Sequence, residues 1–326
     1  MPLLIRNRNR EDGTGGRAPS PAAMKAAFPF RSAENLPLQR STPRREQTPD
    51  AGRRGIFETC ANPGCNSGWL HLWRSRSTPV FEDGWTCSPE CTLAHVEAAV
   101  RREMDGQDRV GSVRPHRIPL GLLMLEQRWI TQDQLRQALK AQRAAGRGRI
   151  GEWLVRQRAV SEELVTRALG LQWSCPVLPL EFHDPEGLAV LLPRLFVDAF
   201  GALPLRVAAR RILYLGFEER PDPALALALE TMMGLRVESG LVRESAFRAA
   251  HANMLQAEFP PVELVEAVSA TALAQVFARA VERTKPMASR LVRIHGCLWL
   301  RMWLRPQSGL LPEAASIKDM VGSIGL

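Results

Sequence analysis

Long apolar runs are missing from this sequence, and no stretch of its 326 residues has the roughly 20 apolar residues that a membrane-spanning helix requires. The segment from Met1 to Arg6 also lacks the apolar core of a secretory signal. Both absences argue against membrane-spanning and secreted classes of protein. We therefore expect a cytoplasmic protein without a transmembrane segment.

Catalytic motifs are missing as well. No Gly-x4-Gly-Lys-Ser/Thr loop occurs, so the chain has neither a backbone cradle for a nucleoside triphosphate nor a lysine for its phosphates. The glycines Gly146, Gly148 and Gly151 lack the strand-to-helix context of a dinucleotide-binding turn. No group of acid, base and nucleophile is visible. These absences predict a non-enzymatic protein.

Acidic residues are scarce at the amino terminus. The whole chain has a formal charge of +9, and residues 1–55 hold 11 Lys/Arg against 5 Asp/Glu. This stretch is rich in Pro, Gly, Ser and Arg and has too little apolar surface to fold. We predict that residues 1–54 form a disordered basic leader, which either is merely solvated or contacts nucleic acid or anionic lipid.

Cysteine is sparse, but four of the six cysteines are clustered. They are Cys60, Cys65, Cys87 and Cys91, arranged as Cys-x4-Cys, a gap of 21 residues, and Cys-x3-Cys. In a reducing compartment such a cluster indicates metal ligands rather than disulfides, and four thiolates suit Zn²⁺ in a closed tetrahedral site. We predict a structural zinc site that supplies folding energy to this segment. Four buried or free thiols are the alternative.

The residues around these cysteines predict short elements in a definite order. Trp69–Trp73 and Pro79–Phe81 are interpreted as strands, and Thr92–Val100 as a helix for which Ser88 is the N-cap. A knuckle, a hairpin and then a ligand pair at a helix start resemble a treble-clef zinc finger. Residues 55–105 are therefore predicted to be a treble-clef-like zinc-binding module.

The most informative pattern occurs twice, with each position of the second copy 30 residues after its partner in the first. The first copy consists of Leu120, Gly121, Met124, Leu125, Ile130, Leu135, Leu139 and Gln142. The second copy consists of Ile150, Gly151, Leu154, Val155, Val160, Val165, Leu169 and Gln172. Repetition at a fixed period indicates a duplicated structural unit. Two like half-sites also suit a ligand that has two like halves.

Each copy is predicted to be a short helix, a turn and a second helix. Pro119 can open the first helix of copy one. Thr131 and Gln134 form a capping box for its second helix, and Ser161 is the corresponding N-cap in copy two. We expect a helical tandem-repeat subdomain over residues 115–180.

The repeated pattern of a Leu/Ile-Gly pair, an aliphatic pair and Leu-x3-Leu-x2-Gln resembles the N-terminal domain of type II secretion and type IV pilus assembly ATPases. Their ATPase domain has no counterpart in this sequence. In some members of that family each copy holds half of one cyclic di-GMP. The resemblance implies these nucleotide-binding positions: Leu120, Gly121, Gln142, Arg149, Ile150, Gly151, Leu154 and Gln172. In that role the arginine would stack on guanine and pair with phosphate.

The first copy departs from the family pattern. Pro119 stands where the family has an arginine, which removes a stacking plane and a charge, although Arg117 is nearby. Arg128 and Arg158 replace a glycine that usually precedes the aliphatic pair. Some members of the family keep the fold and do not bind the nucleotide, so a purely structural repeat is the alternative.

The resemblance continues through residues 181–256, where the predicted order is helix, strand, strand, helix, strand, helix. Pro185–Phe200 and Pro223–Met233 are interpreted as helices, and Leu203–Ala209 and Arg211–Phe217 as paired strands. This segment is predicted to be a small α/β sandwich subdomain of the secretion-ATPase N-terminal type.

The C-terminal extension, residues 257–326, is predicted to hold a helix and a β-hairpin. Leu264–Glu282 is interpreted as an amphipathic helix, and the hairpin turns at His295 and Gly296. A last short helix is expected to carry these residues on one face: Ile317, Met320, Val321 and Ile324.

The predicted hairpin has one apolar face and one basic-aromatic face. The basic-aromatic positions are Arg293, His295, Trp299, Arg301, Trp303 and Arg305. Such a face can stack bases and neutralise phosphates, or it can dock a protein partner. The third possibility is that a neighbouring helix covers it.

These patterns together predict an α+β protein that acts as an adaptor or regulator. By resemblance, the central region would dock a component of a secretion or pilus machine in trans. One alternative is a cyclic di-GMP sensor that uses the tandem repeat. The other is a zinc-dependent nucleic-acid-binding protein that uses the zinc module, the basic leader and the Arg/Trp strand.

Overall fold

The protein is described by a computed structural model. It defines residues 60–65, 79–82, 84–106, 117–181, 183–208, 211–306, 309 and 311–325. The predicted leader, residues 1–54, and the predicted strand Trp69–Trp73 lie outside these residues. All of the described residues belong to one compact unit, Thr48–Leu326.

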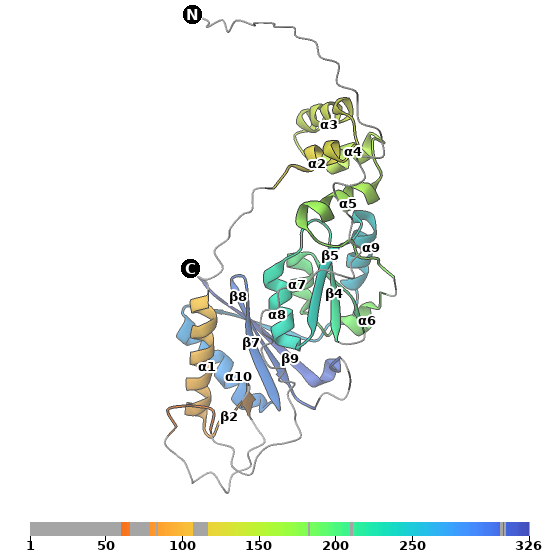
Figure 1. The fold of residues 1–326 in the computed structure, drawn as a ribbon. Coiled ribbons are helices and arrows are strands. Elements are labelled where there is room, and N and C mark those ends of the chain that lie inside the picture. The colour runs from red at the N-terminus through yellow and green to blue at the C-terminus, as the bar shows by residue number, and fades with distance from the viewer. Residues whose placement is uncertain are drawn as a thin grey trace, which may run out of the picture. The chain divides into compact units, whose positions relative to one another are not determined.

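Helices and strands are mixed along the described chain, so the predicted α+β class is confirmed (Figure 1). The helices are α1 (Pro89–Asp105), α2 (Leu120–Glu126), α3 (Gln132–Ala145), α4 (Ile150–Arg156), α5 (Glu162–Trp173), α6 (Pro185–Leu188), α7 (Arg194–Phe200), α8 (Pro223–Met233), α9 (Glu244–Met254) and α10 (Ala270–Thr284). The strands are β1 (Val80–Phe81), β2 (Gly84–Trp85), β3 (Ala202–Ala208), β4 (Ile212–Phe217), β5 (Arg236–Leu241), β6 (Val262–Ala267), β7 (Ala288–Ile294), β8 (Cys297–Trp303) and β9 (Ile317–Ile324).

The strands of the described residues form a two-stranded, a three-stranded and a four-stranded sheet. In the first, β1 pairs with β2 in antiparallel fashion. The second has the order β3-β4-β5, with β3 antiparallel and β5 parallel to β4. The third has the order β6-β9-β8-β7, in which only β6 and β9 run parallel.

The α/β subdomain forms largely as its sequence predicts. β3 and β4 pair as a hairpin, and α8 ends at Gly234, whose φ of 62° is the left-handed conformation that favours glycine. One prediction is wrong: Pro185–Phe200 is not a single helix but two, α6 and α7. Pro193, which precedes α7, cannot donate a helical hydrogen bond and interrupts the helix.

The C-terminal extension departs most from its prediction. Leu264–Glu282 divides into strand β6 and helix α10, because Ser269 caps α10 by accepting a hydrogen bond from the Ala272 N–H. The predicted last helix is wrong, since Ile317–Ile324 is strand β9 between β6 and β8. Gly322 lets α10 approach this strand closely, because a Cβ there would lie 2.5 Å from Leu273 Cδ1.

The segment that carries the clustered cysteines and the C-terminal sheet share one hydrophobic core, although they lie far apart in the sequence. Helix α1 packs against α10, and β1 lies beside the start of β7. Val80 N–H donates to Pro286 O at 3.0 Å, and Glu82 N–H donates to Ser289 O at 2.7 Å. The common core includes Phe81, Val96, Val100, Leu273, Phe277, Leu300 and Met320.

The basic-aromatic face of β8 is not open to solvent. Trp299 and Arg301 are fully buried, and both donate hydrogen bonds to Asp319 on β9. The cover comes from the α/β subdomain rather than from α10, because Arg301 Nη1 also donates to Val190 O at 2.8 Å. The third possibility, cover by a neighbouring helix, is correct in that Trp299 and Arg301 are covered, but the α/β subdomain provides the cover. The prediction that Arg301 on this strand binds nucleic acid is wrong.

Candidate metal centre and tandem-repeat interface

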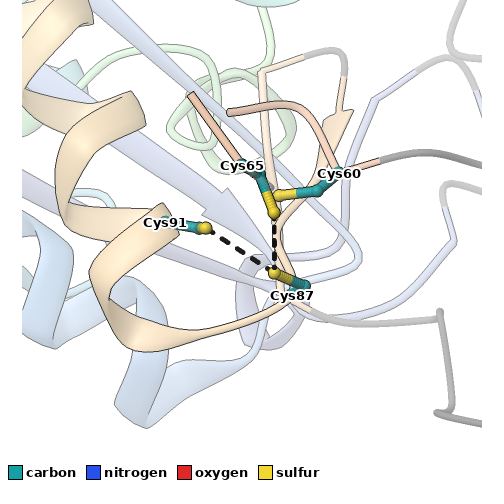
Figure 2. A group of neighbouring side chains, drawn as sticks. All are labelled: Cys60, Cys65, Cys87 and Cys91. Atoms are coloured by element: carbon teal, nitrogen blue, oxygen red, sulfur yellow. Dashed lines mark hydrogen bonds between the residues drawn. The ribbon is translucent and has the colours of Figure 1, made fainter. Parts of the chain in front are cut away.

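The four predicted cysteines converge at the N-terminal end of α1 (Figure 2). Their Sγ atoms all lie within 4.8 Å of one another. Cys87 Sγ is 3.5 Å from Cys65 Sγ and 3.6 Å from Cys91 Sγ. Zn–S bonds of about 2.3 Å in a tetrahedron place the sulfurs about 3.8 Å apart, whereas a disulfide needs about 2.0 Å. The cluster therefore has the spacing of a thiolate metal site.

Asn62 organises the knuckle that carries the first cysteine pair. Its backbone carbonyl accepts from Cys65 N–H at 3.0 Å, and its Oδ1 accepts from Gly64 N–H at 3.0 Å. Its Nδ2 donates to Cys91 Sγ at 3.4 Å, so the same side chain braces the turn and contacts a sulfur of the second pair. Such outer contacts orient metal ligands and tune their charge.

The second cysteine pair is positioned by the start of α1, as the sequence predicts. Ser88 is the N-cap, and its Oγ accepts from Cys91 N–H at 3.3 Å. Cys91 therefore lies in the first helical turn, at the positive end of the helix dipole. Burial raises the pKa of the Cys60 thiol above its ordinary value, and a cation that replaces the proton would reverse that preference.

This centre could hold a metal ion with four protein ligands. A tetrahedral ion with four thiolates has no open position for a substrate or a reactive water. With such an ion bound, the site would be a structural one. It would fix the knuckle to α1, and α1 in turn covers the core shared with α10.

The two copies of the tandem repeat have equivalent elements. Helices α2 and α4 are both 7 residues long, and each is followed by an arginine in the left-handed conformation. Arg128 has a φ of 57°, and Arg158, the equivalent residue, has a φ of 56°. The duplicated unit predicted from the sequence is therefore confirmed, and these two positions are ones at which glycine is favoured.

The repeated glycines lie where the first helix of each copy touches the second. A Cβ on Gly121 would lie 2.7 Å from Leu135 Cδ1, and a Cβ on Gly151 would lie 2.7 Å from Val165 Cγ1. Leu154 is fully buried in the same cluster. These three predicted ligand positions therefore take part in the packing between the helices of the repeat.

The repeated glutamines join the two copies reciprocally. Gln142 Nε2, in the first copy, donates to Gly148 O at 2.8 Å. Gln172 Nε2, in the second copy, donates to Ile118 O at 2.7 Å. Because Gly148 and Ile118 are equivalent positions two residues before α4 and α2, the bonds relate the copies by an approximate twofold symmetry.

Arg149, the predicted stacking residue, lies among carboxylates. Its guanidinium is 2.9 Å from Glu152, 2.9 Å from Glu218 and 3.3 Å from Glu244, and it also pairs with Glu219. Partial burial lowers the pKa of Arg149, but hydrogen bonds to Glu152 and Glu218 outweigh this effect and raise the pKa above its ordinary value. In this structure Arg149 holds α4 against the end of β4 and the start of α9.

Further polar contacts extend this interface between the second copy and the α/β subdomain. Ser245 Oγ donates to Glu162 at 2.7 Å, and Arg243 pairs with Glu163 at 3.0 Å. Both carboxylates lie in the first turn of α5. Sequence reasoning missed these partners because they lie about 80 residues apart in the chain and carry no motif.

Leu120 and Ile150, the remaining predicted ligand positions, are partly buried against the hydrophobic cluster of the repeat. The structure thus places the predicted ligand positions in one subdomain, where each of them has a contact within the protein. In the described part of the chain, no helix is both long and apolar enough to cross a bilayer.

No known family profile matches the sequence, and no curated protein matches it. Among solved structures, MshE with cdg (cyclic di-GMP) is 26% identical with a TM-score of 0.32, and the match covers 42% of this chain and 99% of that one. The N-terminal domain of XpsE matches in two crystal forms. These are 17% and 20% identical, with TM-scores of 0.29 and 0.23, and cover 41% and 40% of this chain and 91% and 89% of theirs. Each of these matches covers less than half of this chain and most of the matched one.

Proposed function

We propose that this chain is a non-enzymatic adaptor that docks a protein component of a secretion or pilus assembly machine in trans. The observation that carries the proposal is the way the repeated motif is used. Gln142 and Gln172 close the two copies on each other, and Arg149 fixes the second copy to the α/β subdomain. Because the second copy is fixed to the α/β subdomain and the first copy is fixed to the second, the first copy can offer a rigid surface to a partner.

In this proposal the four cysteines hold Zn²⁺. Two observations support the choice of metal: the donor set consists only of thiols, and the sulfur spacing suits a tetrahedron. The ion would supply the folding energy that keeps the knuckle and α1 in place. The adaptor would then present the repeat from a body in which α1 is fixed against α10 of the C-terminal extension.

Pairwise co-purification tests the adaptor function. The full chain is expressed with each secretion or pilus component encoded beside it, and one of them is expected to elute with it as a complex in gel filtration. If no component binds, the proposed function is wrong. A complex that forms only with nucleic acid present would favour the nucleic-acid alternative instead.

A cyclic dinucleotide is the second candidate ligand. The approximate twofold symmetry of the repeat favours it, because the two halves of cyclic di-GMP are alike. The carboxylates around Arg149 oppose it, since a phosphate would have to displace them. Calorimetric titration of the wild-type chain with cyclic di-GMP decides the matter, with Arg149→Ala as the variant and Arg236→Ala as a surface control. Absence of heat with the wild-type chain rejects this candidate.

A further inference from the structure

Large apolar side chains remain exposed along one edge of the tandem repeat. Ile118, Leu122 and Leu171 are 55%, 54% and 48% exposed, and Val177 is 46% exposed. The Gln172 hydrogen bond to Ile118 O joins the start of α2 to the end of α5. Val177 is close to α5 as well, because a Cβ at Gly170 would lie 3.5 Å from Val177 Cγ2. We call these four exposed residues the α2–α5 patch.

The internal repeat shows how the equivalent face is used in the second copy. Leu122 corresponds to Glu152, and Pro119 corresponds to Arg149, 30 residues later in each case. In the second copy this face binds the start of α9 through Arg149 and Glu244. The chain therefore contains one example of this face docked on the N-terminal end of a helix that carries a carboxylate. In the first copy, aliphatic side chains replace the charged pair.

Three arginines lie around the patch, together with Glu126, which is one helical turn after Leu122 on α2. The Arg117 guanidinium lies 3.2 Å from the Trp173 ring centroid, and that of Arg220 lies 5.6 Å from the same centroid. Arg167 lies one helical turn before Leu171 on α5. Within the described residues none of these three arginines forms an ion pair with a carboxylate, whereas Arg149 pairs with four. An apolar centre with unpaired arginines at its rim is complementary to an apolar surface with acidic flanks.

We propose that the α2–α5 patch is the site at which the partner docks an amphipathic helix, with aliphatic residues toward the patch and Asp or Glu on its flanks. This inference rests on the proposed adaptor function and specifies the chemistry of the partner. A nucleic acid fits less well, because aliphatic side chains offer no stacking surface and Arg117 already covers a face of Trp173. A protein helix also follows the example that the second copy provides.

Site-specific crosslinking in cells tests the proposal on the full chain. A photoreactive amino acid replaces Leu122 on the patch or, as the matched control, Leu227, which is 62% exposed on α8. The crosslink from position 122 is expected to map to one acidic amphipathic segment of a machine component, and position 227 is expected not to reach it. Mass spectrometry identifies the crosslinked segment.

A synthetic peptide of that segment then serves as the probe for purified protein. Leu122→Glu and Arg117→Glu are each expected to weaken its binding by about tenfold or more, whereas Leu227→Glu leaves it unchanged. Added salt is expected to weaken binding to the wild-type chain and to have less effect on Arg117→Glu. Thermal unfolding of each variant checks that the substitution leaves the fold intact, above all for Arg117→Glu, which removes the contacts of Arg117 with Trp173 and Gln172 O.

Several results would overturn the docking site. They are a crosslink from position 122 to this chain itself, to a second copy, to nucleic acid or to a segment without acidic residues, or no crosslink at all. Binding to anionic phosphatidylglycerol vesicles that Leu122→Glu abolishes would assign the patch to a lipid surface instead. If a machine component co-purifies but Leu122→Glu does not weaken the complex, the site is wrong and the adaptor function stands. If no component co-purifies, both are wrong.

Discussion

Arg301 and Asp319 form a bidentate ion pair in the interior, with side chains that are 0% and 1% exposed. Arg301 Nε donates to Asp319 Oδ1 at 2.8 Å, and Nη2 donates to Oδ2 at 2.6 Å. Because Arg301 Nη1 also reaches Val190 O, the pair links β8 and β9 to the segment that follows α6. It therefore binds the C-terminal sheet to the α/β subdomain.

Asp319→Ala is expected to lower the free energy of unfolding by about 3–5 kcal/mol, because it leaves a buried guanidinium without a counter-ion. Urea denaturation followed by circular dichroism measures the loss. Arg136→Ala is the matched control, since it breaks an ion pair with Asp133 that is largely exposed, and little change is expected. Equal losses in the two variants would show that the buried pair is not special.

The zinc proposal predicts one Zn²⁺ per chain, measured by elemental analysis. Cys87→Ser and Cys91→Ser are expected to lose the metal, and Cys297→Ser, outside the cluster, is expected to keep it. Chelation should increase hydrogen exchange in α1 and in the strand β7 beside it, because the ion stabilises that packing. Unchanged metal content in Cys91→Ser would contradict the predicted ligand set.

Substitution of the repeated glycines tests the close helix contacts within each copy. Gly121→Ala and Gly151→Ala are each expected to destabilise the protein by about 1–3 kcal/mol, because the new methyl group overpacks the contact. Val165→Ala should partly restore the Gly151→Ala variant. Gly106→Ala is the control, since a Cβ there meets nothing within 4 Å. Neutral substitutions at both repeated glycines would show that the copies are loosely packed.

Substitution of the two arginines with a left-handed backbone, Arg128 and Arg158, is expected to raise the stability of the protein rather than lower it. Arg128→Gly and Arg158→Gly are each expected to stabilise the protein by about 0.5–1 kcal/mol, because glycine relieves the strain of a positive φ. Arg136→Gly inside α3 should instead destabilise it by about 1 kcal/mol. Thermal denaturation of the three variants gives the comparison. A loss of stability at both left-handed positions would contradict this interpretation of the turn.

The carboxylates around Arg149 make the repeat interface sensitive to salt, and Glu152 makes the start of α4 sensitive to acid. The hydrogen bond from Arg149 lowers the pKa of Glu152 below its ordinary value of 4.5. The stabilisation is therefore complete above that value and is lost as the pH falls through the lower pKa of the folded state. Hydrogen exchange in α4 should rise under acid, exchange in α4 and α5 should rise at high salt, and Arg149→Ala should raise exchange in α4 at neutral pH. Exchange that responds to neither condition would show that the interface does not depend on these charges.

Local sequence signals predicted local structure well. Ser88, Ser161 and the Thr131–Gln134 capping box all act as predicted, because a cap depends on atoms within three residues. The 30-residue period likewise predicted two like helical units. The four cysteines could be identified as one cluster because metal ligation needs particular donors in any backbone arrangement.

The positions that the sequence left open are those decided by distant partners. Alternation along residues 292–305 placed Arg301 on the basic-aromatic face of the hairpin, but only its contacts with Asp319 and Val190 O show that Arg301 is buried there. The spacing of Ile317–Ile324 suits a helix or a strand, and pairing with both β6 and β8 selects the strand.

The sequence by itself therefore determined the caps, the duplication and the grouping of the four cysteines in this protein. Only the tertiary structure decided which charges are buried, which faces are covered, and that α1 and α10 share a core. The physical reason is that ion pairs and strand pairs join residues far apart in the chain. The periodicity of hydrophobic residues within one segment does not indicate which distant segment it pairs with.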